Sequence, residues 1–145
     1  MEQTSVKIMQ CAIANSGQMK IDCIGVGVGI ILHSRLKKKA AGLHVLVPHS
    51  STPSAPNPVK FANLAIPHVL GLLEKEGVSP PFTVSIAGGA AMEGSPSGKG
   101  MGVKVVEAVK NALSEAKLSI TVDDTGGSKI RSMLLDIETG KIEII

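Results

Sequence analysis

A stretch in the first quarter of the chain, Ile-Asp-Cys-Ile-Gly-Val-Gly-Val-Gly-Ile-Ile over residues 21–31, places glycine at every second position from Gly25 to Gly29. In a β-strand, successive side chains point to opposite faces of the sheet. The stretch therefore predicts one strand with an apolar, β-branched face and a second face that is bare after Cys23. Interior glycines weaken a strand, so three of them at period two indicate a close neighbour on the bare face. That neighbour is another part of the protein, a ligand or a partner.

The composition limits the fold and the classes of function. The chain has 145 residues, no Trp, no Tyr and only two Phe. This length suits a single domain over residues 1–145, with a core built from Val, Ile, Leu, Ala and Met. The formal charge of +3 is mild, and almost no aromatic side chains are present to stack on bases. We therefore do not expect nucleic-acid binding.

The same inventory bears on location and cofactors. No stretch reaches the length of uncharged apolar residues that a membrane span requires. The first residues, Met-Glu-Gln-Thr-Ser, lack the basic and apolar regions of a signal peptide, which predicts a cytoplasmic protein with free thiols. The four His and two Cys residues show no paired ligand spacing, so we expect no metal ion and no cofactor.

Strand-like and helix-like segments share the rest of the chain. Strands are expected at residues 5–14, 21–32, 41–48, 82–87, 119–122, 130–137 and 141–145, the last two forming a hairpin. Apolar spacing predicts helices over residues 61–77 and 103–117, and Pro67 either kinks the first helix or lies in a first turn that starts late. Residues 33–39 indicate a solvated, basic hairpin tip or a surface for an anionic partner, and residues 123–127 a tight loop. The predicted fold is a single-domain α/β sandwich of mixed, largely antiparallel sheets, with two main helices on one side.

Two features could carry chemistry. Cys23 and His44 lie on consecutive expected strands, so the imidazole could take the thiol proton and the thiolate could attack a carbonyl carbon. The alternative is a small buried hydrophobe at Cys23 and a hydrogen-bonded core residue at His44. A loop over residues 94–102, which begins at Gly94 and ends at Gly102, could bind phosphate or another small ligand. Its Gly-Lys pair is followed by Gly rather than Ser or Thr, so it does not match a P-loop.

Six further segments occur in a recognisable order. They are Leu-His-Val-Leu-Val-Pro at 43–48, Ile-Ala-Gly-Gly-Ala-Ala-Met at 86–92, Val-Glu-Ala-Val-Lys at 106–110, Asp-Thr-Gly-Gly at 124–127, Arg-Ser at 131–132 and Ile-Glu-Thr-Gly-Lys at 137–141. Together with the glycine stretch they resemble the CheD family, the chemoreceptor glutamine deamidases of bacterial and archaeal chemotaxis. The resemblance extends over essentially the whole chain.

The resemblance implies a compact α/β sandwich that hydrolyses receptor glutamine amides to glutamate and releases ammonia. It implies a Cys nucleophile, a His base and a Thr that orients the His. The implied partners are chemoreceptor cytoplasmic helices and the phosphatase CheC. Substrate-binding roles are implied for Gly88, Gly89, Lys104, Asp124 and Thr125.

The chain departs from the family pattern at the catalytic positions. The family strand reads Gly-x-Gly-Ser-Cys-Val, and counting back from His44 without gaps puts the Cys position at Gly27 and the Thr position at Ile21. On one continuous strand, Cys23 would lie about 13 Å from position 27, too far to replace the nucleophile. The sequence therefore predicts a non-catalytic homologue that binds a receptor or a CheC-like protein. An active deamidase that uses Cys23 with His44 is the alternative.

Overall fold

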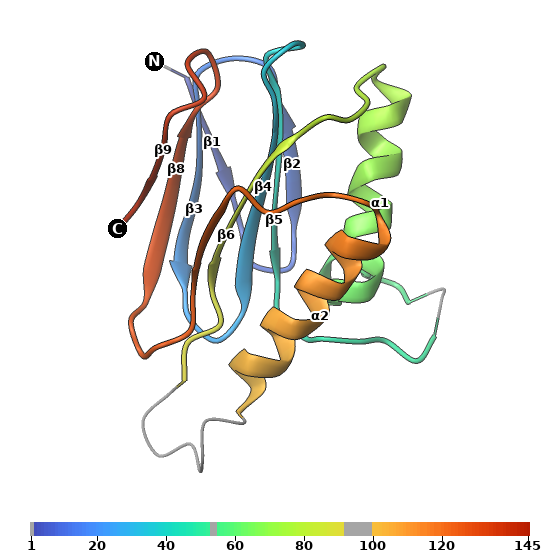
Figure 1. The fold of residues 1–145 in the computed structure, drawn as a ribbon, viewed down its shortest axis with the longest axis vertical. Helices are drawn as coiled ribbons and strands as arrows, with labels where there is room; N and C mark the ends of the chain where they lie inside the picture. The colour runs from blue at the N-terminus through green and yellow to red at the C-terminus, as the bar shows by residue number, and fades with distance from the viewer. Residues whose placement is uncertain (1, 53–54, 92–99) are drawn as a thin grey trace.

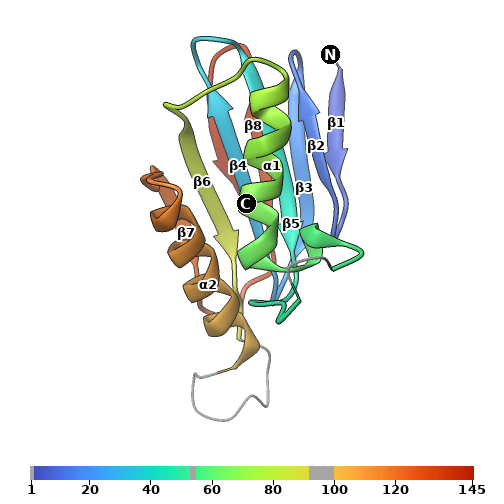
Figure 2. The ribbon, with the colours of Figure 1, turned by 90° about the vertical axis from the view of Figure 1, so that its right-hand side faces the viewer.

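The computed structural model describes residues 2–52, 55–91 and 100–145, which form three layers (Figure 1). A four-stranded sheet packs on a five-stranded sheet, and both long helices cover the outer face of the five-stranded sheet (Figure 2). This arrangement confirms the predicted α/β sandwich. No helix in the described part of the chain combines the length and the apolar character needed to cross a membrane.

The sheets are mixed and largely antiparallel, as expected. The strands are β1 (Gln3–Val6), β2 (Cys11–Ala14), β3 (Gln18–Ile24), β4 (Val28–Ser34), β5 (Lys39–Val45), β6 (Thr83–Gly88), β7 (Val122–Thr125), β8 (Arg131–Asp136) and β9 (Ile142–Ile144). The helices are α1 (Ala62–Lys75) and α2 (Met101–Glu115), and a 3-10 turn η1 (Pro58–Lys60) precedes α1. The two sheets have the orders β1-β3-β8-β9 and β2-β5-β4-β6-β7. The pairs β1–β3 and β6–β7 are parallel, and the other ladders are antiparallel.

Two apolar layers hold the domain together, one between the sheets and one between the five-stranded sheet and the helices. Strand β4 contributes to both because its side chains alternate. Ile30 and Leu32 face the helices, whereas Ile31 faces the other sheet. A Cβ on Gly29 would lie 2.7 Å from Ile24 Cδ1, so the absence of a side chain at Gly29 admits close packing of the opposite sheet. The neighbour that the glycine pattern indicated is, at this position, another part of the protein.

The glycine stretch is two strands and not one. Strand β3 ends at Ile24, residues 25–27 form a bend, and β4 begins at Val28 in the other sheet. The prediction of a single strand across residues 21–31 is therefore wrong, and the 13 Å separation derived from it does not apply. His44 lies on β5, so Cys23 and His44 also come from different sheets rather than from consecutive strands. The alternation of apolar residues and glycine does not reveal that the chain passes from one sheet to the other, because side chains alternate in the same way in β3 and in β4.

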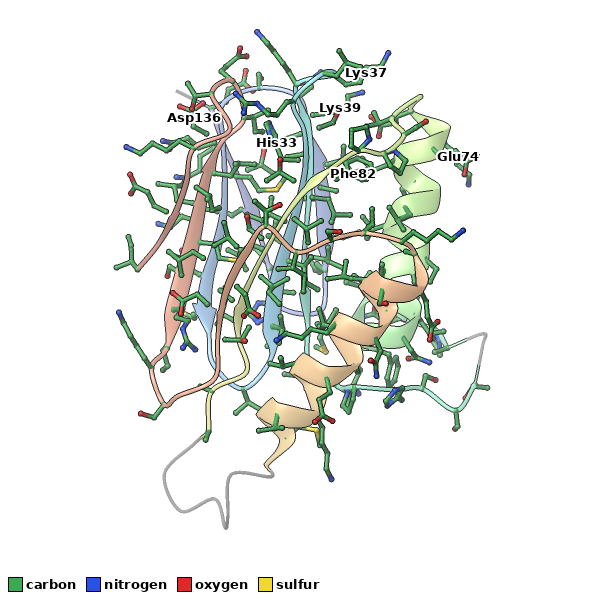
Figure 3. All side chains as sticks on the ribbon, in the orientation of Figure 1. His33, Lys37, Lys39, Glu74, Phe82 and Asp136 are labelled. Carbon is green, nitrogen blue, oxygen red and sulfur yellow. The ribbon has the colours of Figure 1, made fainter. Side chains whose placement is uncertain are left out.

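Other boundaries differ as well. The expected strand at 5–14 is divided into β1 and β2. The strand expected at 119–122 is wrong for residues 119–121, because β7 begins only at Val122 and takes in most of the loop expected at 123–127. Helix α1 already begins at Ala62 and contains Pro67, which excludes a late start. His33 is buried, and its Nε2 donates to the carbonyl oxygen of Ile137 at 2.9 Å, so it is not part of a solvated tip. Figure 3 shows His33 below the hairpin tip that carries Lys37, on the side of the β8–β9 turn.

Candidate functional site

The bend between β3 and β4 lies against the end of β5. The carbonyl of Gly27 accepts a hydrogen bond from the N–H of Gly89 at 2.8 Å, and the carbonyl of Gly25 accepts one from Ala90 at 3.0 Å. A Cβ built on Gly27 would lie 3.5 Å from Nε2 of His44 and 2.5 Å from the carbonyl oxygen of Val45. A side chain at position 27 would thus face the imidazole, and the present backbone leaves no room for it.

His44 is buried, with 2% of its surface exposed. Its Cα pairs with that of Gly29 on β4, and a Cβ on Gly29 would lie 3.4 Å from Ile21 Cδ1, so His44 and Ile21 belong to the same inter-sheet region. Nδ1 of His44 is the one fully buried side-chain nitrogen or oxygen without a hydrogen-bond partner among the described residues. Ile21 has no polar group to offer, and the expected hydrogen-bonded core histidine is therefore not found at Nδ1. Burial lowers the pKa of His44 because the charged imidazolium would lose its hydration.

Cys23, one residue before the end of β3, has an unusual backbone conformation. Its φ is 54°, in the left-handed region that non-glycine residues seldom adopt, and the register with β8 shifts between Ile21 and Ile24. In the register that puts the Cys position at Gly27, the family motif has Gly at position 23, which suits this backbone. The thiol-bearing residue is exposed, so the expectation of a small buried hydrophobe is wrong.

Cys23 and His44 line the same cavity, which has a volume of about 400 Å³. Lys7, Lys20 and Asp22 also line it. No hydrogen bond joins the Cys23 sulfur to the imidazole within the described ranges. The structure thus brings the two sequence candidates to one cavity without a hydrogen bond between them in the described ranges.

Four of the five expected substrate-binding residues lie together. Gly88 pairs with Thr125 in the β6–β7 ladder, Asp124 precedes Thr125, and Gly89 continues from Gly88 to the bend at 25–27. A small cavity of about 160 Å³ lies between Gly89, Thr125 and α2. Lys104 is on the exposed side of α2 and does not line this cavity, so the structure does not bring it to the other four.

Arg131 is a residue that sequence reasoning did not place in the site. It is 8% exposed, and its guanidinium donates to Asp124 Oδ1 at 3.1 Å and to the carbonyls of Gly88 and Gly126 at 3.2 and 2.6 Å. These bonds fix the ends of β6 and β7 to the start of β8, next to the bend at 25–27. The sequence signal that could have pointed to Arg131 is its position soon after the Asp-Thr-Gly-Gly segment.

The structure bears on metal binding but does not describe most of the expected anion loop. No three side chains of His, Cys, Asp or Glu gather as metal ligands within residues 2–52, 55–91 and 100–145. Most of the loop expected at 94–102 lies outside the described residues, which resume at Gly100. A larger cavity of about 580 Å³ lies between α1 and α2, lined by Asn63, Leu70 and Ala112 among others, and His44 does not line it.

Comparison with known proteins identifies the family. The family model described as CheD chemotactic sensory transduction matches residues 46–145. A probable chemoreceptor glutamine deamidase CheD from Clostridium botulinum is 39% identical over 156 aligned residues, covering 99% of this chain and 94% of that protein. The chain belongs to the CheD family.

Two further CheD relatives are also similar over most of their length. A probable chemoreceptor glutamine deamidase CheD from Clostridium novyi is 39% identical, covering 86% of this chain and 82% of the relative. One from Methanococcus maripaludis is 34% identical, covering 94% and 90%. The CheD family model begins at residue 46, after the segment that contains Ile21, Gly27 and His44. The part of this chain that the model matches therefore does not include residues 21, 27 and 44.

Proposed function

We propose that this CheD-family protein binds a chemoreceptor or a CheC-like partner in the cytoplasm and does not carry out Cys-dependent deamidation. The curated relatives are named as probable chemoreceptor glutamine deamidases, which supports a place in chemotaxis. The observation that carries the proposal is the bare position 27. A side chain there would face Nε2 of His44 from 3.5 Å, and Gly27 has none.

Thiol-dependent amide hydrolysis requires a sulfur within hydrogen-bond reach of its base. The base takes the thiol proton, the thiolate attacks the amide carbon, ammonia leaves, and water cleaves the resulting thioester. In this chain the lowered pKa keeps His44 neutral and able to accept a proton. Position 27 has no proton to give, and Ile21 has no hydroxyl with which to orient the imidazole through Nδ1.

The backbone around the bend supports the same conclusion. The carbonyl of Val45 occupies space that a Cβ at position 27 would need. The bend is held there by hydrogen bonds from Gly89 and Ala90, and Arg131 keeps the neighbouring strand ends in place. An ordered surface around the site therefore persists without a nucleophile, and such a surface is what a binding protein needs.

The test uses the full chain and a receptor cytoplasmic fragment that carries deamidation-sensitive glutamines. We expect the fragment or a CheC-like protein to bind in isothermal titration calorimetry. We expect no ammonia release and no conversion of glutamine to glutamate by mass spectrometry. The Clostridium botulinum relative, assayed on the same fragment, serves as the positive control. Conversion above the rate of the fragment alone would contradict the proposal.

A second candidate function is favoured by the shared cavity. Cys23 is exposed and lines the cavity together with His44, so a shift of the β3 end could bring sulfur and imidazole together for deamidation. Ammonia release that disappears in Cys23→Ala and persists in Cys11→Ala would identify this activity. Cys11 is a fair control because it packs on the helix side of the five-stranded sheet and lines no part of this cavity.

A further inference from the structure

We propose that the cavity beside His44 binds the carboxylate side chain of a glutamate on the partner, which is the product of the family reaction rather than its substrate. The inference rests on the proposed function, because it assumes a partner that carries such a side chain. The cavity is lined by residues at the end of β1 and in the second half of β3, together with His44 of β5. Its volume of about 400 Å³ falls within the range of small-ligand sites, roughly 300–1,000 Å³.

The charges at the cavity favour an anion. Lys7 and Lys20 line it together with a single carboxylate, Asp22. Asp22 lies 3.4 Å from the Nζ of Lys20, so these two charges largely offset each other. Lys7 makes no ion pair among the residues that the structure describes. One positive charge therefore remains for a ligand.

The remaining walls suit the stem and the head of a glutamate side chain. Val6 and Ile8 supply apolar surface for methylene groups. His44 lines the same cavity and contributes a polar imidazole to its wall. A short apolar stem that ends in a carboxylate matches these walls and the unpaired charge of Lys7.

Discrimination between glutamate and glutamine follows from charge rather than from shape. The two side chains have nearly the same size, so the apolar walls do not separate them. The unpaired charge of Lys7 attracts the carboxylate and gains little from the neutral amide. An exposed pair of this kind gives a preference of about threefold, and partial enclosure in the cavity increases it. A protein that has lost its nucleophile would in this way recognise the deamidated state of its partner.

The experiment uses the full-length protein and two synthetic peptides from a receptor cytoplasmic helix that differ only by glutamate or glutamine at the deamidation site. Calorimetry gives both affinities for the wild type, for Lys7→Met and for Lys37→Met. Lys37 is a matched control because it is an exposed lysine at the β4–β5 hairpin tip, away from the cavity (Figure 3). Alkylation by iodoacetamide reports occupancy, with Cys23 at the cavity and Cys11 as the reference thiol.

We expect the glutamate peptide to bind at least threefold more tightly than the glutamine peptide. Lys7→Met should remove this preference and Lys37→Met should keep it. The glutamate peptide should slow alkylation of Cys23 and leave Cys11 unaffected.

Equal affinities, an unprotected Cys23, or protection by free L-glutamate but not by the peptide would each overturn the inference. If neither peptide binds, the inference also fails, whereas binding of the intact receptor fragment would leave the proposed function standing. Release of ammonia from the glutamine peptide would contradict the proposed function itself.

Discussion

Gly27→Ala is the substitution that most directly tests the geometry of the bend. The added Cβ would lie 2.5 Å from the carbonyl oxygen of Val45, and real Cβ atoms stay beyond 3.0 Å from such an atom. The two backbone segments must therefore separate by about 0.5 Å. The hydrogen bond from Gly89 to the carbonyl of Gly27 opposes this movement. Overpacking of this kind costs about 1–3 kcal/mol.

Gly25→Ala is the matched control, because a Cβ on Gly25 meets nothing within 4 Å. Both substitutions reduce the conformational entropy of the unfolded chain equally, by about 0.4–1 kcal/mol. The difference between the two variants therefore isolates the contact with Val45. We expect Gly27→Ala to have a free energy of unfolding about 1–3 kcal/mol below that of Gly25→Ala.

Urea unfolding followed by far-ultraviolet circular dichroism measures this difference, since the chain has no Trp or Tyr for intrinsic fluorescence. Equal midpoints for the two variants would refute the argument that the bend has closed over position 27. Gly27→Cys carries the same Cβ, so restoring the thiol should lower stability by a similar amount. A single substitution would then be insufficient to rebuild a working nucleophile at this position.

Three further predictions concern the same region. Cys23→Gly should raise the free energy of unfolding by about 1 kcal/mol relative to Cys23→Ala, because glycine adopts the left-handed φ of 54° without strain. A Gly variant less stable than the Ala variant would contradict this expectation. Arg131→Lys should destabilise the fold by about 2 kcal/mol, because lysine cannot reproduce the directed hydrogen bonds to Asp124, Gly88 and Gly126. An unchanged urea midpoint would show that these hydrogen bonds contribute little to stability. Because burial lowers the pKa of His44 in the folded protein, the unfolded chain binds a proton at this residue more readily. The contribution of His44 to the free energy of unfolding should therefore be full above about pH 6.5 and should fall as the pH drops towards the pKa of His44 in the folded protein. In urea unfolding, His44→Gln should remove this part of the pH dependence of the midpoint. His49→Gln changes an exposed histidine and should retain it. The reverse pattern would show that His44 is not the source of the pH dependence.

Much of the fold could be read from local patterns. The apolar spacing over residues 103–117 predicted α2, observed at Met101–Glu115, and the Glu-Thr-Gly turn predicted the β8–β9 hairpin. Both depend on contacts between residues close in the sequence. The position of β7 at Val122–Thr125, rather than at 119–122, could not be predicted from local patterns. Asp123 and Asp124 are poor strand formers and pair only because β6 lies beside them.

The candidate site shows the same division. The sequence relates position 27 to His44 when residues are counted back from His44 in the register of the family motif. The structure places a Cβ built on residue 27 at 3.5 Å from Nε2 of the imidazole. The unpartnered Nδ1, the exposure of Cys23 and the role of Arg131 were not available from the sequence. Each depends on which strands face one another, and that is set by pairing between segments far apart in the chain.

For the glycine stretch, the sequence by itself determined that Val28 and Ile30 would share one face of a strand and that Gly29 would leave the other face without a side chain at its position, because strand alternation is a local property. It also determined that no thiol stands at position 27. Tertiary structure decided that the stretch divides between two sheets, with a bend at 25–27 held against the end of β5. The physical reason is that a bend of glycines satisfies its backbone groups through Gly89 and Ala90, which lie more than sixty residues away in the sequence. Those partners exist only once both sheets have formed.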